Sequence, residues 1–180
     1  TTVDDDDWNS LAGDLVFDAG ETTKSFTFNV NGDELDEPSE DLYFRMTDYN
    51  NTRKYTGADY YRIKFLDDDD EPEVFFSESD VGENEEVVNP SITIELDAES
   101  GRDIIVTYSD VTEASGGTAT PDVDYTSFTE AQTLTIEAGE TSNTFTLAIT
   151  DDALYEADET ILYTISEANY ATPSAGAGQT

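Results

Sequence analysis

Cysteine and histidine are both absent from the 180 residues of this chain. Without cysteine, the chain can form neither a disulfide bond nor a thiolate metal site. Without histidine, it lacks the commonest transition-metal ligand and the usual general base of enzymes. These absences argue against a zinc site and against most kinds of catalytic centre, and they leave oxygen as the abundant metal-ligating atom.

Basic residues are scarce as well: seven Lys and Arg stand against 43 Asp and Glu, which gives a net charge of −36. Such a chain repels nucleic acid and anionic membranes, so we expect no nucleic-acid partner. No apolar run approaches the roughly 18 residues of a spanning helix, so we expect no membrane insertion. After Arg102 there is no Lys or Arg at all. The carboxylates beyond it are therefore screened by water and salt, or by a bound cation.

Apolar and polar residues alternate in many short stretches of the chain. These stretches are 26–30, 42–46, 61–65, 92–96, 104–108, 145–149 and 161–165. A period of two is typical of strands with one buried face, and turn signals such as AGE, SGG and NG separate the stretches. No stretch sustains helical spacing. The pattern predicts an all-β protein built from β-sandwiches.

One segment of the chain occurs twice. Residues 19–48 (AGETTKSFTFNVNGDELDEPSEDLYFRMTD) align without a gap with residues 138–167 (AGETSNTFTLAITDDALYEADETILYTISE), so equivalent numbers differ by 119. Upstream, VDDDDWNS (3–10) matches TPDVDYTS (120–127), which pairs Trp8 with Tyr125. The acidic positions recur too: Asp33, Glu37 and Glu40 correspond to Asp152, Glu156 and Glu159. Recurrence at fixed spacing indicates two related structural units.

The sequence LDDDDEPEVFF (66–76) reads as a junction, because an acidic run and a proline precede a new strand. We therefore predict one domain over residues 1–70 and a second over 71–180. The first lacks the opening strands that the second shows at 74–110, and the second lacks a counterpart of YYRIKFLDDDD. A section of a longer array and strands supplied by neighbouring molecules both explain this arrangement.

The order of these motifs resembles the Calx-β domain, which was first described in sodium–calcium exchangers. The resemblance is carried by GGTATPDVDY (116–125), the AGET turn, ITDDALYEADET (149–160) and a closing strand followed by DDDD. It implies tandem immunoglobulin-like antiparallel β-sandwiches, the first without its opening strands and the second without its last strand. It also implies calcium sites at one end of each sandwich, built from the acids of several loops.

The resemblance implies metal ligands in both units. In the second unit, positions that match the family's ligands are Glu83, Asp124, Asp151, Asp152, the backbone carbonyl of Leu154, Glu156 and Glu159. In the first unit, they are Asp7, Asp33, Glu37, Glu40, Asp67, Asp68 and Asp69. The first unit departs from the pattern, because it lacks the early glutamate and has Gly32 where the second unit has Asp151.

Calcium suits these residues chemically. It takes six to eight oxygen ligands and tolerates irregular geometry, whereas magnesium demands a tighter octahedron. The spacing of Asp152, Glu156 and Glu159 lets one loop direct several carboxylates at one point. No EF-hand pattern occurs. The alternative is that an acidic run is a solvated loop, which is the usual case and the favoured interpretation for residues 4–6.

An enzyme is not expected. Paired carboxylates can mark a glycosidase, but no substrate-binding pattern accompanies them. Ser and Thr are plentiful, yet no partner that would activate a nucleophile is visible.

The leading hypothesis is a calcium-binding structural or adhesive repeat of a secreted or cell-surface protein, in which Ca2+ stiffens the domain ends and the junction. Its expected partners are neighbouring copies or repeats, by strand exchange into a filament, while an unidentified protein or glycan ligand stays open. The alternative is a regulatory calcium sensor that controls an attached protein. Asn50 begins an Asn-Asn-Thr sequon, which permits N-glycosylation in a secreted protein.

Overall fold

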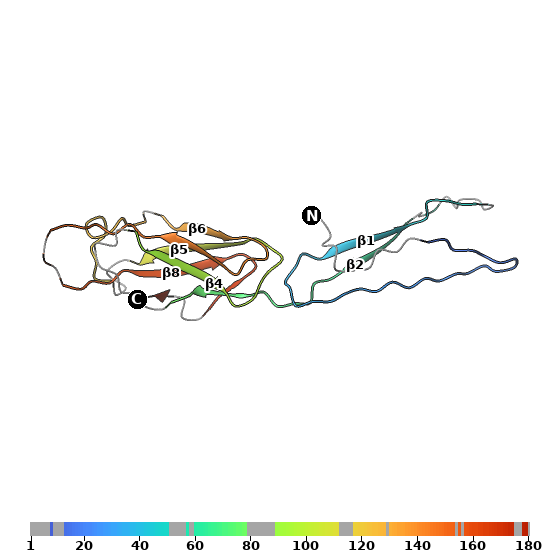
Figure 1. The fold of residues 1–180 in the computed structure, drawn as a ribbon, viewed down its shortest axis with the longest axis horizontal. Coiled ribbons are helices and arrows are strands. Elements are labelled where there is room, and N and C mark those ends of the chain that lie inside the picture. The colour runs from blue at the N-terminus through green and yellow to red at the C-terminus, as the bar shows by residue number, and fades with distance from the viewer. Residues whose placement is uncertain are drawn as a thin grey trace. The chain divides into compact units, whose positions relative to one another are not determined.

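The computed structural model describes Trp8 and residues 13–50, 57, 60–78, 89–111, 117–128, 130–153, 155, 157–174 and 178–179. The chain divides into two compact units (Figure 1). Unit 1 comprises Thr1–Glu34 and Ser39–Phe65, and unit 2 comprises Leu35–Pro38 and Leu66–Thr180. The short segment Leu35–Pro38 thus packs with unit 2, although unit 1 flanks it on both sides in sequence.

All regular elements in the described residues are strands. They are β1 (Glu40–Arg45), β2 (Tyr60–Phe65), β3 (Glu73–Phe76), β4 (Ser91–Leu96), β5 (Ile104–Val111), β6 (Gln132–Ile136), β7 (Ser142–Thr146), β8 (Leu162–Ala168), β9 (Thr172–Pro173) and β10 (Gly178–Gln179). Within this described part, no helix has the length and apolar character needed to cross a membrane. The predicted all-β fold is confirmed.

In the described part of unit 1, β1 and β2 form an antiparallel pair, in register from Glu40↔Phe65 to Arg45↔Tyr60. The ring of Phe44 on β1 packs against Phe26 at 5.0 Å and Phe28 at 4.9 Å between centroids. Phe26, Phe28 and Phe44 thus pack on one side of this small sheet and Tyr43 packs against Tyr60 on the other, while many large apolar side chains of unit 1 stay exposed.

The strand predicted at 26–30 does not form. Residues 26–29 belong to no sheet, and Val30 makes only an isolated bridge to Trp8. The physical reason lies in the missing neighbour. In unit 2, the strand predicted at 145–149 forms only at Phe145 and Thr146, which end β7; Ile149 makes an isolated bridge to Tyr125, as Val30 does to Trp8. β7 itself forms because it pairs with β4 from Ser91↔Thr146 to Glu95↔Ser142. The described part of unit 1 contains no strand that corresponds to β4, so the alternation is present without a backbone partner.

Unit 2 is a sandwich of two four-stranded sheets, with strand orders β10-β8-β5-β6 and β7-β4-β3-β9. All neighbours are antiparallel except β3 and β9. The β5–β8 pairing contains a register shift between Thr107 and Tyr108. Such a shift bends a strand and increases its twist.

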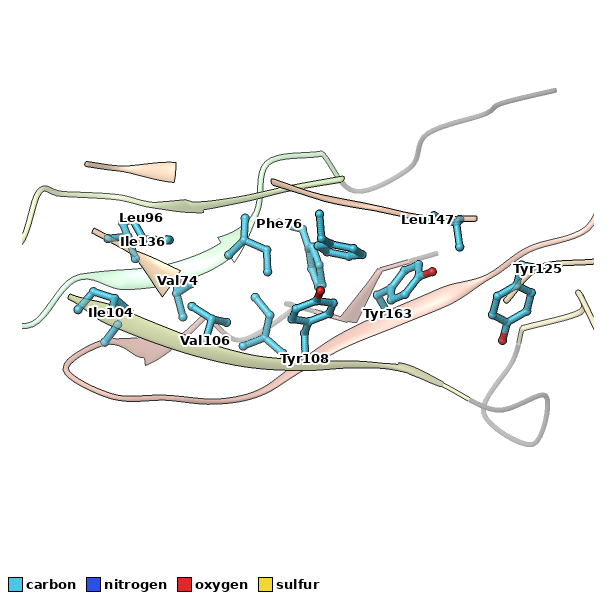
Figure 2. Packing of buried hydrophobic residues seen from close by; sticks show 14 of the residues in the cluster. Val74, Phe76, Leu96, Ile104, Val106, Tyr108, Tyr125, Ile136, Leu147 and Tyr163 are labelled. Carbon is cyan, nitrogen blue, oxygen red and sulfur yellow. The ribbon is translucent and has the colours of Figure 1, made fainter. Parts of the chain in front are cut away.

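The core of unit 2 lies between its two sheets. Alternate residues of β5 are buried there, namely Ile104, Val106 and Tyr108, and Val74 and Phe76 of β3 contribute from the opposite sheet. Figure 2 shows this row of side chains, with Ile104 near one end and Tyr125 at the other. An aromatic group fills the half nearer Tyr125: Tyr108 stacks on Phe145 at 4.2 Å, and Phe145 meets Tyr163 edge-on at 5.4 Å.

Unit 2 has two distinct ends. Strand β5 runs from the base, which we define as residues 35–38, 66–72, 97–103 and 137–141, to the loop end, which we define as residues 117–128, 147–153 and 157–161. At the base, the N–H of Gly139 donates to the carbonyl of Ser100 at 2.9 Å. At the loop end, the N–H of Thr126 donates to the carbonyl of Ala148 at 2.9 Å.

The repeat seen in the sequence is also a repeat in structure. The bridge Trp8↔Val30 in unit 1 corresponds to Tyr125↔Ile149 in unit 2. Gly20 and Gly139 both have positive φ, at 89° and 82°, in equivalent turns that only glycine adopts readily. The edge-on pair Phe26–Phe44 corresponds to Phe145–Tyr163.

These equivalent aromatic residues differ in how deeply they are buried, which predicts a difference in stability. Phe145 is 8% exposed and Phe26 is 46% exposed. We expect Phe145→Ala to lower the free energy of unfolding of unit 2 by about 4 kcal/mol, because it removes a packed ring and leaves a cavity. We expect the matched variant Phe26→Ala to cost about 1 kcal/mol in unit 1.

Denaturant titration would test this difference, with Trp8 fluorescence following unit 1 and tyrosine near-ultraviolet circular dichroism following mainly unit 2. Equal losses from the two substitutions would contradict the packing described here.

Candidate functional site

The loop end of unit 2 is assembled by backbone hydrogen bonds between segments far apart in sequence. The N–H of Thr150 donates to the carbonyl of Asp124 at 2.8 Å. The N–H groups of Thr118 and Ala119 both donate to the carbonyl of Thr160, at 2.9 and 3.1 Å. Three predicted ligand-bearing segments, 117–128, 147–153 and 157–161, therefore lie together at one end of the sandwich.

Asp124 sits in a tight, internally bonded turn. One oxygen of its carboxylate, Oδ2, accepts from the N–H of Thr120 at 2.6 Å, and its own N–H donates to the Thr120 carbonyl at 3.0 Å. Asp122, with a φ of +63°, accepts at Oδ1 from the N–H and hydroxyl of Ser127, at 3.2 and 2.9 Å. This turn fixes the half-buried carboxylate of Asp124 beside the chain that leads into Asp151.

The remaining described acids of this end are open to solvent. Asp151 and Asp152 follow Thr150 directly, and Glu159 precedes Thr160; all three side chains are exposed. The residue pairing places both segments next to the 117–124 turn, since Thr150 bonds to Asp124 and Thr160 to Thr118. Asp151 and Asp152 follow the bridge residue Ile149, whereas Glu159 lies just before β8. Glu83, Leu154 and Glu156 lie outside the described residues.

The described loop-end residues offer the oxygen ligands that calcium takes. Every available donor is an oxygen atom, and no Lys or Arg occurs after Arg102. However, within the described ranges no three acidic side chains are already gathered around a single point. A complete coordination shell would draw on these exposed carboxylates together with the predicted ligands outside the described ranges, so the ligand set stays a prediction.

The predicted ligands of the first unit are dispersed. Asp33 is exposed in unit 1, and Glu40 begins β1 there, half-buried. Glu37, Asp67, Asp68 and Asp69 belong to unit 2, and Asp68 is exposed. Asp7 lies outside the described residues. Glu37 and Asp67 do come together, around a side chain that was not predicted to take part.

That side chain is Arg102, at the base of unit 2. Its guanidinium lies 3.1 Å from Oδ2 of Asp36 through Nε and 3.5 Å from Oδ2 of Asp67 through Nη2. Nη2 also donates to the carbonyl of Glu37. The same guanidinium stands 4.7 Å from the ring centroid of Tyr170, a cation–π contact. All these residues belong to unit 2.

Asp36 is the innermost member of this group, at 3% exposure. Its Oδ2 accepts from the hydroxyl of Ser100 at 3.1 Å, and its carbonyl accepts from the N–H of Gly101 at 2.9 Å. A Cβ at Gly101 would lie 2.7 Å from Cγ of Glu37, so a larger residue there would displace the Glu37 side chain. A buried carboxylate is tolerated when it is paired and hydrogen-bonded, and Arg102 and Ser100 meet both needs.

Asp36, Ser100 and Arg102 were missed as site residues by the sequence analysis. One signal was available: Arg102 is the last basic residue, and a lone cation amid acids tends to be paired. Its partners could not be named, because Glu37 lies 65 positions away in sequence.

A family model described as the Calx-beta domain matches residues 1–59 and 67–179. The chain belongs to the Calx-beta domain family. The predicted resemblance is therefore confirmed, and so is the tandem β-sandwich class. No curated protein sequence matches this Calx-beta chain.

Solved structures with similar folds include a crystal structure of the apo form of the Calx CBD1 domain. It is 15% identical with a TM-score of 0.53, over 60% of this chain and 91% of that one. The Calx CBD2 domain is 23% identical with a TM-score of 0.48, over 58% and 61%. The calcium binding domain CBD12 of CALX1.1 is 21% identical with a TM-score of 0.47, over 82% and 55%. The match covers little more than half of that last structure, and the first likeness supports the fold alone.

Removing the charge of Arg102 should destabilise unit 2. We expect Arg102→Gln to lower the free energy of unfolding by about 3 kcal/mol, because the buried carboxylate of Asp36 would lose its cation. Arg62→Gln is the matched control. Its ion pair to Asp41, at 3.6 Å, is largely exposed and should contribute less than about 1 kcal/mol.

Thermal unfolding of the two variants under identical salt conditions measures the contrast. A similar loss in both would mean that Arg102 acts through net charge and not through the buried pair.

Proposed function

We propose that this Calx-beta chain is a calcium-binding structural module in which Ca2+ binds at the loop end of unit 2. Calx-beta domains are non-catalytic calcium-binding modules, which is consistent with the expectation that this chain is not an enzyme. The observation that carries the proposal is the hydrogen-bonded convergence of the 117–128, 147–153 and 157–161 segments, each bearing predicted acidic ligands. Arg102, the last basic residue of the chain, lies at the base, where its guanidinium pairs with Asp36.

The residues that would hold calcium are Asp124, Asp151, Asp152 and Glu159, with Glu83, Glu156 and the carbonyl of Leu154 as predicted additions. A bound calcium ion would supply the positive charge that this acidic end lacks. The chain's own contribution is positional: the 120–125 turn holds Asp124, and the bond from Thr150 to its carbonyl sets where the next loop begins. Because repulsion among the carboxylates opposes loop closure, binding energy would appear as added stability.

A structural role and a regulatory role differ in the calcium affinity that they need. Extracellular structural modules bind calcium at about 10⁻⁴–10⁻³ M, and intracellular sensors at about 10⁻⁷–10⁻⁵ M. We propose the structural role, in a secreted or cell-surface protein, with the ion stiffening the end of the sandwich. The sensor role is the second candidate, and it is favoured by the family match and by the similarity of the fold to the Calx CBD1 domain.

We further propose that unit 1 associates with neighbouring copies or repeats by adding strands. In unit 2, Ile165 is 6% exposed beneath the opposing sheet, while its equivalent in unit 1, Met46, is 60% exposed. Strands delivered by a neighbour would cover this apolar side, and would offer Phe26–Val30 the backbone partner that its alternation requires. An adhesive role for such an assembly would need a protein or glycan ligand of its own.

Calcium should raise the melting temperature of unit 2 specifically. At about a hundredfold excess over Kd, we expect a rise of roughly 10 °C relative to chelator at fixed ionic strength. Magnesium should give much less. Asp152→Asn with Glu156→Gln should abolish the rise, because both are predicted ligands. The midpoint of the titration separates the structural role from the sensor role.

The matched control is Glu137→Gln with Glu140→Gln, which removes the same charge from exposed positions at the base. A rise that any salt reproduces, or one lost equally in the control, would show that the acids form a solvated surface.

Strand addition should appear as association that survives mild denaturant. We expect light scattering after size-exclusion chromatography to show oligomers that increase with concentration, and Met46→Lys to dissociate them. Val123→Lys, at a position of unit 2 that is 58% exposed, is the control and should leave them intact. A monodisperse monomer at high concentration would contradict the proposal.

A further inference from the structure

Asp110 is an acidic residue in an inward-facing position of the unit 2 core. It lies next to the end of β5, where it continues the buried series Ile104, Val106 and Tyr108. A half-buried carboxylate in such a position is costly unless polar groups satisfy it. Its partners therefore indicate what this residue does.

Both oxygens of Asp110 are used by the loop that carries Asp124. Oδ2 accepts from the hydroxyl of Tyr125 at 2.9 Å, and Oδ1 accepts from the N–H of Phe128 at 3.3 Å. Hydrogen bonds to an ionised acceptor are stronger than neutral ones, and they are stronger still away from water. Asp110 thus fixes the 120–128 loop to the end of β5 at two points.

Tyr125 transmits this attachment to the loop end. It is 2% exposed, it follows Asp124 directly, and its backbone bridges to Ile149. The N–H of Thr150 donates to the carbonyl of Asp124, and Asp151 comes next. Displacing the Tyr125 ring would therefore move Asp124 and the start of the 150–153 segment together.

The surroundings of Asp110 also show that its charge faces the buried aromatic group. Asp110 and Tyr163 are direct partners across β5 and β8. Burial, and secondarily the charge of Asp110, raise the pKa of the Tyr163 hydroxyl well above its usual value. That hydroxyl is buried and has no hydrogen-bond partner within the described residues. The tyrosine hydroxyl that donates to Asp110 is therefore that of Tyr125, and not that of its strand partner Tyr163.

We infer that Asp110 is a positioning residue for the loop-end calcium site, acting through the hydroxyl of Tyr125 to hold Asp124 and Thr150 in place. This inference rests on the proposed calcium binding at the loop end. Removing a residue that orients a metal ligand by a hydrogen bond typically lowers metal affinity by about 10- to 100-fold. Asp110 has no predicted role as a ligand and would act without touching the ion.

The test is calorimetric titration of Ca2+ into the full 180-residue chain and into four variants. We expect Tyr125→Phe, which removes only the hydroxyl and leaves the charge unchanged, to weaken calcium binding by about 10-fold. Asp110→Asn should weaken calcium binding at least as much. The double variant, Tyr125→Phe with Asp110→Asn, should bind calcium as tightly as Asp110→Asn alone. Asp103→Asn is the matched control, because Asp103 accepts the N–H of Ala138 at 3.1 Å at the opposite end of β5. It should change affinity less than about twofold.

A second measurement is independent of calcium binding. Hydrogen exchange at the Thr150 amide, followed without calcium, should accelerate in Tyr125→Phe and stay unchanged in Asp103→Asn.

The outcomes distinguish the inference from the function on which it rests. A wild-type chain that binds no calcium overturns the proposed function, and this role of Asp110 with it. Calcium binding by the wild type with unchanged affinity in Tyr125→Phe overturns the role of Asp110 alone. Additive losses in the double variant would also overturn it, because Asp110 would then act by charge and not through Tyr125.

Discussion

Mutual repulsion among carboxylates is the constraint that unit 2 must satisfy before it can fold. Its sequence contains many acids and only one basic residue, Arg102. The base and the loop end meet this constraint in different ways. At the base, a guanidinium lies among Asp36, Asp67 and the carbonyl of Glu37, so the compensating charge is built into the chain. At the loop end, backbone N–H groups and a tyrosine hydroxyl satisfy individual oxygens, and the net negative charge remains.

The internal repeat allows one unit to be interpreted through the other. The turns at Gly20 and Gly139, the bridges of Trp8 and Tyr125, and the two edge-on aromatic pairs correspond position by position. What differs is the presence of neighbouring strands. In unit 2, β4 pairs with β7 in the same sheet, and Tyr108 of β5 in the opposing sheet stacks on Phe145; the described part of unit 1 contains no equivalent of β4 or β5. The same local sequence therefore gives a strand in one setting and an unpaired extended segment in the other, which is a tertiary effect on a local pattern.

Much of the fold could be predicted from alternation alone. The patterns at 42–46, 92–96, 104–108 and 161–165 correspond to β1, β4, β5 and β8. The failure at 26–30 arose because periodicity reports a buried face and not the presence of a partner. β6 was overlooked because only Leu134 and Ile136 alternate in it. The division into domains at residue 70 stays a prediction, as does the ligand set.

The candidate site was predictable only in part, for a related reason. Acids that recur at fixed spacing and match a known family can be read from sequence, so Asp124, Asp151 and Glu159 were named as candidate ligands. Residues that act from inside the sandwich cannot be found in this way, because their partners are set by the packing of distant strands. Asp110 gave one signal, an acid in an inward-facing position of β5, whose meaning depends on Tyr125.

The segment Leu35–Pro38 gives unit 2 a discontinuous sequence. The family match resumes at residue 67, yet the contacts of Asp36 with Ser100 and Arg102 belong to the same compact unit. A protease cut between Phe65 and Leu66 would therefore leave unit 2 in two pieces held together without a covalent bond. The family match and the compact unit therefore place the start of this domain at different residues. A fusion protein that began at residue 67 would separate Arg102 from its buried counter-ion, Asp36.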